Sequence, residues 1–153
     1  MGELLLSLSY LQSAAKLSVV ILKANSLRLL AVDNKPYPDA CVKVTLFDRL
    51  GKKVKRKKST VQRSSDCPVF NEELIFELRR DQATDVVIEV RVVHESLAYR
   101  EQLGSVVFGP SLTSATKGSL SPENVYWSTI LSGESLHAQW HMLKPSVKLD
   151  ESK

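Results

Sequence analysis

The stretch LLLSLSY at Leu4–Tyr10 decides how the fold is interpreted. Leu4, Leu6, Leu8 and Tyr10 alternate with Leu5, Ser7 and Ser9. A period of two is typical of a β-strand that buries one face, because successive side chains of a strand point to opposite sides. This stretch is therefore predicted to be a half-buried strand.

Further segments along the chain have the composition of strands, and turn-forming residues separate them. They are Leu17–Ala24, Cys41–Phe47, Lys52–Val61, Phe70–Leu78, Val86–Val93, Leu103–Phe108 and Leu136–Leu143. One short helix is predicted before the last strand, with Ser121 as N-cap, Pro122 at the first helical position and Gly133 as C-cap. Eight short strands joined by turns favour an all-β fold, an antiparallel sandwich.

The composition is that of an ordinary globular domain. A chain of 153 residues, 43% hydrophobic and 25% charged, is long enough to form one domain with its own core. Cys41 and Cys67 form no CxxC pair, which argues against a disulfide scaffold or a zinc ribbon and favours a reducing compartment. The apolar start of the chain lacks the features of a signal peptide and of a myristoylation site.

The segment Lys52–Lys58 carries the basic character of the chain. It places six basic side chains in seven positions, with only Val54 between them. The net charge is +4, from 21 basic and 17 acidic residues, so without this segment 15 basic residues would face 17 acidic ones. The positive charge is therefore a local feature and not a property of the whole surface.

We predict that this basic segment is a strand with two different faces. The first face would carry Lys53, Lys55 and Lys57, and the second Lys52, Val54, Arg56 and Lys58. Val54 favours the second face as the one nearer the core. A strand in an otherwise slightly acidic protein disfavours nuclear import or nucleic-acid binding. An anionic membrane, an acidic protein partner and a simply solvated face remain as alternatives.

The sequence contains none of the common catalytic motifs. A nucleophile elbow, a phosphate-binding glycine loop, an HExxH helix and a dinucleotide fingerprint are all absent. His137 and His141 would lie roughly 13 Å apart on a strand, too far to bind one metal ion. His141 is interpreted as a packed or hydrogen-bonded side chain. We therefore expect a protein that is not an enzyme.

Several strings, in their order, resemble the C2 domain family and in particular the second C2 domain of synaptotagmins. They are GELLLSLSYL at Gly2–Leu11, VVILKA at Val19–Ala24, KKVKRKKST at Lys52–Thr60, CPVFNEELIFEL at Cys67–Leu78, the pair Tyr126-Trp127 and WHML at Trp140–Leu143. The resemblance implies an eight-stranded antiparallel Greek-key β-sandwich over residues 2–143, with three loops clustered at one end. A polar, flexible tail is expected over residues 144–153.

The resemblance also implies where a calcium site would lie. The family's first loop supplies two aspartates six positions apart, and Asp33 and Asp39 keep this spacing. The third loop follows a VVDYD pattern in the family, but this chain has VVHES, so His94 and Ser96 replace two carboxylates. Calcium requires roughly six to eight oxygen ligands, several of them charged, and imidazole is a poor ligand for a hard cation.

Asp33 and Asp39 are therefore interpreted as remnants of a calcium site, and no metal or other cofactor is expected. Aspartate also suits exposed turns, where it hydrogen-bonds the nearby backbone. Glu95 and Glu101 are the acids that would have to rebuild a weak site. The sequence predicts a C2 domain that works without calcium.

The function that the resemblance implies is that of a binding module in membrane trafficking and exocytosis. The predicted lipid- or partner-binding residues are Lys52, Lys53, Lys55, Arg56, Lys57 and Lys58. Expected partners are anionic lipids such as phosphoinositides, SNARE or adaptor proteins, and another C2 domain in the parent chain, but no nucleic acid. Binding of fusion-machinery or adaptor proteins without lipid contact is the alternative. The expected location is the cytosolic face of vesicle or plasma membranes, with a membrane-anchored parent protein.

Overall fold

The computed structural model describes residues 2–31, 36–97, 100–110, 122–133 and 137–145. Its strands are β1 (Glu3–Leu11), β2 (Lys16–Asn25), β3 (Ala40–Phe47), β4 (Lys53–Lys58), β5 (Val69–Glu77), β6 (Val87–Glu95), β7 (Arg100–Phe108) and β8 (Gln139–Met142). Its helices are η1 (Gln12–Ala14), α1 (Arg80–Ala83) and α2 (Pro122–Leu131). Each expected strand is present, although the fourth and the last are shorter than predicted.

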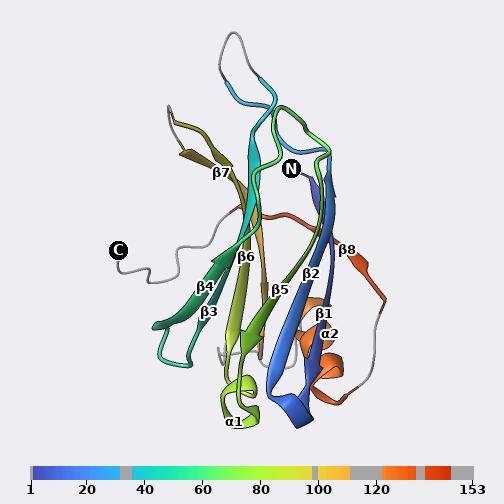
Figure 1. The fold of residues 1–153 in the computed structure, drawn as a ribbon, viewed down its shortest axis with the longest axis vertical. Helices are drawn as coiled ribbons and strands as arrows, with labels where there is room; N and C mark the ends of the chain where they lie inside the picture. Colours follow the sequence, from blue (N-terminus) through green and yellow to red (C-terminus); the bar gives the residue numbers. More distant parts are fainter. Residues whose placement is uncertain (1, 32–35, 98–99, 111–121, 134–136, 146–153) are drawn as a thin grey trace.

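The strands form two antiparallel four-stranded sheets that pack as the layers of a sandwich (Figure 1). The first sheet has the order β5-β2-β1-β8 and the second the order β4-β3-β6-β7. The chain changes sheets between β2 and β3, β4 and β5, β5 and β6, and β7 and β8, which is typical of a Greek-key sandwich. The predicted fold class is confirmed.

The core lies between the two sheets. The alternation in β1 buries Leu4, Leu6, Leu8 and Tyr10, as the sequence predicts. In the second sheet, β3 is buried on both faces, so its outward side chains are also shielded from water. Lys43 of β3 is only 7% exposed although it points away from the core. The outer face of the second sheet therefore carries shielded polar side chains along its two central strands, β3 and β6.

The predicted helix is present as α2, next to β1 and β7 (Figure 1). It begins at Pro122, while the predicted N-cap Ser121 lies outside the described residues. The hydroxyl of Tyr126 accepts a hydrogen bond from the backbone N–H of Leu8 over 3.1 Å. Leu8 lies beyond Leu6, the last residue of β1 that pairs with β8. Tyr126 thus supplies an acceptor that the short strand β8 does not provide.

Three connections gather at one end of the sandwich, the upper end in Figure 1. They are the β2–β3, β4–β5 and β6–β7 segments. The backbone N–H of Ser65 donates to the carbonyl of Pro38 over 3.0 Å, and that of Glu95 donates to the carbonyl of Asp39, also over 3.0 Å. These bonds tie the β2–β3 segment to both of its neighbours, which confirms the implied clustering of the loops.

Candidate functional site

Strand β4 contains most of the basic segment and lies at the edge of the second sheet. Its residues are exposed, except that Lys57 is half-buried. Among the described strands it pairs only with β3. Lys52 is exposed just before the strand. The structure therefore places the predicted basic residues together, on an exposed edge.

The expected orientation of β4 is wrong, and a β-bulge explains why. Lys57 and Lys55 pair with the core residues Val44 and Leu46, so they lie on the side facing the other sheet. The register shifts between Leu46 and Phe47. Phe47 pairs with Lys53, which leaves Val54 as the residue without a partner at the irregularity. An extra residue at a bulge breaks the alternation of the strand. Val54 is 48% exposed and does not mark the side nearer the core.

Two lysines of β4 face the seam between the two sheets. Lys57 donates a hydrogen bond to the backbone carbonyl of Ile75 in β5, and its Nζ lies 5.5 Å from the centre of the Phe76 ring. Lys55 and Lys57 border a hollow there, together with Lys16 and Glu77. The aliphatic stems thus cover the side of the sandwich while the ammonium groups stay near solvent.

Arg56 and Lys58 face the opposite way, onto the outer face of the second sheet. They pair with Thr45 and Lys43 of β3. A hollow of about 370 Å³ opens on this face. It is lined by Lys43, Arg56, Arg91, Val93, Arg100, Glu101 and Gln102. We call it the outer-face pocket.

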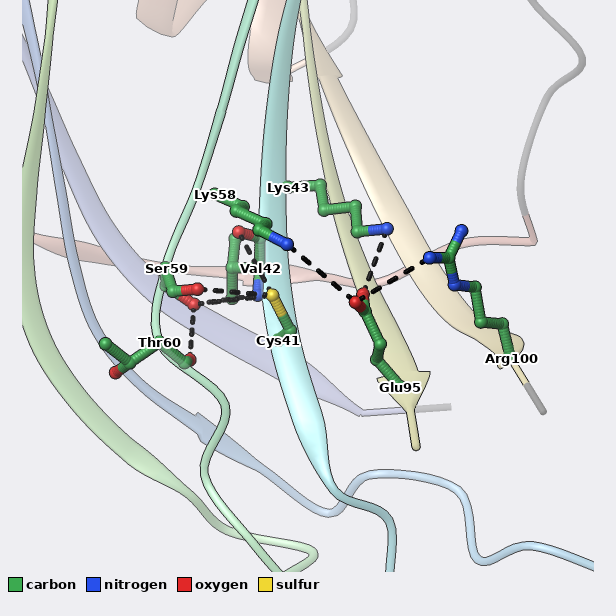
Figure 2. A network of polar contacts seen from close by, with 8 residues as sticks. All are labelled: Cys41, Val42, Lys43, Lys58, Ser59, Thr60, Glu95 and Arg100. Atoms are coloured by element: carbon green, nitrogen blue, oxygen red, sulfur yellow. Dashed lines mark hydrogen bonds and ion pairs between the residues drawn. The ribbon is translucent and has the colours of Figure 1, made fainter. Parts of the chain in front are cut away.

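Three of the cations on this face surround one carboxylate, as Figure 2 shows. Glu95 lies 3.0 Å from Nζ of Lys43, 3.8 Å from Nζ of Lys58 and 3.9 Å from the guanidinium of Arg100. The hydrogen bond from Lys43 and the charges of Lys43, Lys58 and Arg100 lower the pKa of Glu95, against the effect of partial burial. Glu95 therefore carries its negative charge at neutral pH.

The end of β4 is fixed to β3 by a small polar cluster, also drawn in Figure 2. The hydroxyl of Ser59 accepts a hydrogen bond from the N–H of Val42 over 2.9 Å, and the thiol of Cys41 donates to the carbonyl of Ser59 over 3.3 Å. Burial raises the pKa of the Cys41 thiol. Cys41 is thus held as a neutral thiol, which is not the form that reacts as a nucleophile.

Of the two aspartates interpreted as remnants of a calcium site, the structure describes Asp39, which makes contacts within the protein. Asp33 lies outside the described residues. The carboxylate of Asp39 accepts a hydrogen bond from the N–H of Ser64 over 2.9 Å. The backbone N–H of Asp39 donates to Nδ1 of His94, which is 4% exposed. From the position where the resemblance puts a carboxylate, His94 thus joins the β2–β3 connection to the end of β6, and Ser96, two residues further along, is half-buried.

The two acids that could rebuild a calcium site are paired with cations. Glu95 faces Lys43 on the outer face, and Glu101 accepts a hydrogen bond from Arg28. Arg28 also donates to the carbonyl of Gln102, so it connects the β2–β3 segment to β7. Among the described residues, no group of three or more His, Cys, Asp and Glu side chains is placed to hold a metal ion.

His141 is a packed residue, as predicted. It is 6% exposed, and its ring meets those of Phe108 and Tyr126 edge-on, with centroids 5.0 and 5.1 Å away. Burial lowers the pKa of His141, although the charge of Glu123 opposes this. His137 is exposed.

The sequence interpretation missed Lys43, Arg91 and Arg100 as parts of the basic surface. A signal was present for two of them, because Lys43 interrupts the apolar string CVKVTLF and Arg91 the string VVIEVRVV. Lys43 and Arg91 pair with each other across β3 and β6. A charged residue within an apolar strand indicates that its face has polar partners.

Comparison with known proteins agrees with this architecture. The profile of the C2 domain matches residues 15–124. The chain belongs to the C2 domain family. Human synaptotagmin-2 is 34% identical over 152 residues, which are 98% of this chain and 34% of that protein. Human synaptotagmin-12 is 40% identical over 111 residues, which are 72% of this chain and 26% of that protein. This C2 chain thus spans about a quarter to a third of the length of these relatives.

Solved C2 structures share the fold. A C2 domain of RIM from Drosophila superposes with a TM-score of 0.68 at 20% identity, covering 94% of this chain and 98% of that domain. The first C2 domain of human synaptotagmin XIII gives a TM-score of 0.61 at 16% identity, covering 98% and 91%. These structures confirm the C2 fold, and the sequence identity to the synaptotagmins confirms the resemblance at the level of the family.

Proposed function

We propose that this chain is a C2 module of a membrane-trafficking protein and that it binds anionic phospholipid, phosphoinositide above all, through β4 without calcium. The observation that carries the proposal is the exposed edge strand β4, whose cations project from both of its faces. We propose a binding module and not an enzyme. Its similarity to human synaptotagmin-2 and synaptotagmin-12 supports this role.

The charges on β4 support weak membrane contact. A basic residue close to an anionic membrane contributes about 1 kcal/mol. Three to five engaged residues therefore supply about 3–5 kcal/mol, which corresponds to millimolar or slightly tighter binding. Arg56 can add paired hydrogen bonds to a phosphate group, since the guanidinium presents its donors as a fork. The pocket beside Arg56, lined by further cations, favours a headgroup that carries several phosphates.

Binding of this strength requires help from the rest of the parent protein. A membrane anchor or a second C2 domain would raise the effective concentration of β4 at the membrane. We propose that the parent protein is anchored in a vesicle or plasma membrane and presents this domain at the cytosolic face. In the part of the chain that the structure describes, no helix is long and apolar enough to cross a bilayer.

Calcium binding is not part of the proposed function, because residues at the loop end of the domain already have partners within the protein. His94 accepts a hydrogen bond from the Asp39 backbone, and Glu101 accepts one from Arg28. A calcium ion would have to displace the cation at Glu101 and would still lack the carboxylates replaced by His94 and Ser96. Calcium sites depend on the number and charge of their oxygen ligands.

Three double variants test whether both faces of β4 contribute to membrane binding. Arg56→Gln with Lys58→Gln removes two charges from the outer face, and Lys55→Gln with Lys57→Gln removes two from the seam. Lys23→Gln with Arg79→Gln is the matched control away from β4. In co-sedimentation with phosphatidylcholine vesicles containing phosphatidylinositol bisphosphate, we expect both β4 variants to lose binding and the control to keep it. Equal binding by all three proteins would refute a role of β4.

The same edge also fits a protein partner, which is the second candidate. The side of β4 away from β3 has no strand partner among the described residues, and an exposed edge can accept an added strand. An acidic segment of a SNARE or adaptor protein would complement its charge. A pull-down of such a partner that excess phosphoinositide vesicles leave unchanged would favour this function over lipid binding.

A further inference from the structure

We infer that Glu95 is a built-in counter-anion of the outer-face pocket, which limits the affinity of this face for phosphate-bearing ligands. The inference rests on the proposed function, because it concerns the control of the same lipid-binding surface. Its basis is the position of one carboxylate among cations that would otherwise be available to a ligand.

Glu95 shares its cations with the pocket. Lys43 and Arg100 line the pocket and also lie within 4 Å of the Glu95 carboxylate, at 3.0 and 3.9 Å. Lys58, on the basic strand itself, lies 3.8 Å from the same carboxylate (Figure 2). A phosphate group that approached this face would compete with Glu95 for all three cations, because carboxylate and phosphate accept the same charge-assisted hydrogen bonds.

The three ion pairs differ in how easily a ligand can break them. The side chains of Lys43 and Glu95 are 9% and 18% exposed, so their pair at 3.0 Å is largely shielded from water. Lys58 and Arg100 are 63% and 71% exposed and lie further from the carboxylate. Exposed pairs contribute little and rearrange readily, whereas separating a shielded pair leaves a buried charge uncompensated. We expect Lys58 and Arg100 to turn to the ligand while Lys43 stays with Glu95.

The pairing also gives Glu95 a structural role. Lys43 is a nearly buried ammonium group on the outer face, and a charge in such a position requires a partner. The conservative change Glu95→Gln keeps the size of the side chain and one oxygen that can accept the hydrogen bond from Lys43, while it removes the negative charge and replaces the other oxygen by an amide nitrogen. This variant therefore separates the electrostatic role of Glu95 from its role in packing.

The test compares Glu95→Gln with wild type and with Asp81→Asn. Asp81 pairs with Arg79 at α1, and its substitution makes the same change in net charge away from β4. One unit of charge near an anionic surface changes affinity about fivefold, since 1.4 kcal/mol corresponds to a factor of ten. With vesicles of phosphatidylcholine and phosphatidylinositol bisphosphate, we expect Glu95→Gln to bind about fivefold tighter than wild type and Asp81→Asn to bind like wild type.

The outcomes separate this inference from the function on which it rests. If wild type binds the vesicles, loses binding when β4 is neutralised and is matched by Glu95→Gln, the counter-anion role is wrong and the proposed function stands. If neither wild type nor Glu95→Gln binds, both are wrong. Binding by Glu95→Gln alone, or tighter binding by it, supports the inference.

A measurement on the wild-type protein covers the case in which Glu95→Gln does not fold. Soluble inositol trisphosphate, titrated during side-chain NMR, reports on the guanidinium of Arg100 and the ammonium of Lys58. We expect both signals to shift on saturation while that of Lys43 stays in place. Unchanged Arg100 and Lys58 signals at saturation would overturn the inference. If the free phosphate shifts them but vesicles do not bind, the ligand is a soluble phosphate and not a lipid.

Discussion

The backbone N–H of Asp39 donates a hydrogen bond to Nδ1 of His94 over 3.0 Å, and this bond joins the β2–β3 connection to the end of β6. His94 lies where the resemblance to calcium-binding C2 domains puts a carboxylate. The imidazole of His94 thus links the β2–β3 connection to β6 at the position where the resemblance implies a metal-binding carboxylate. At this end of the domain, the Asp39–His94 hydrogen bond connects the two segments within the protein itself.

Replacing His94 by Leu is expected to lower stability. The change leaves the partly buried Asp39 N–H without its acceptor, which should cost up to about 1–3 kcal/mol, the range for a fully buried unsatisfied donor. Urea denaturation of the variant should show a decrease in the free energy of unfolding within this range. His137→Leu, at an exposed position, is the matched control and should leave the free energy unchanged. Equal stability of the two variants would show that the Asp39–His94 bond contributes nothing.

Calcium should not bind to the isolated domain. Isothermal titration calorimetry with calcium up to the millimolar range is expected to give only heats of dilution, because the acids Glu95 and Glu101 are engaged by Lys43 and Arg28. Magnesium serves as the control cation in the same titration. A saturable heat with calcium alone would mean that the loops retain a working site.

The bond from Leu8 to Tyr126 is expected to hold α2 on the first sheet. Tyr126→Phe removes the acceptor of a buried N–H and should lower the free energy of unfolding by about 1–3 kcal/mol. Tyr37→Phe changes an exposed ring, 48% accessible, and should have no measurable effect. Denaturation of both variants in urea gives the comparison. A stable Tyr126→Phe protein would indicate that another group satisfies the Leu8 N–H.

Acid should destabilise the domain through His141. Burial lowers the pKa of His141 in the folded state, so the unfolded chain takes up a proton first as the pH falls below about 6.5. The stability that neutral His141 provides is present at pH 7 and is lost as the pH falls through this range, by up to about 1.4 kcal/mol per pH unit. Thermal denaturation at several pH values checks this. His141→Leu should show a smaller loss between neutral and mildly acidic pH, and identical slopes would contradict the assignment.

Much of the fold could be predicted from the sequence because its cause is local. The alternation in Leu4–Tyr10 appears directly as the buried row of β1, and Pro122 marks the start of α2. The length of β8 was overestimated, because the apolar pattern continues beyond the four residues that form the strand. The pairing of β1 with β8 and with Tyr126 depends on distant residues, which a local pattern does not contain.

The candidate site was predicted in composition but not in geometry. The basic segment was found as a charge run, yet its faces were reversed, because the bulge at Val54 depends on pairing with Phe47 and Leu46. Glu95 was considered only as a possible calcium ligand. Its actual partners, Lys43, Lys58 and Arg100, come from three other strands, so that only the assembled sheet brings them together.

The central claim is that β4 binds anionic lipid without calcium. Its most direct test is co-sedimentation of the wild-type domain with vesicles of phosphatidylcholine and phosphatidylinositol bisphosphate, once with a calcium chelator and once with calcium. A variant with Lys53, Lys55, Arg56 and Lys57 all changed to Gln is measured beside it. We predict equal binding of wild type under both conditions and loss of binding in the variant. Binding that occurs only with calcium, or that survives in the variant, would contradict the claim.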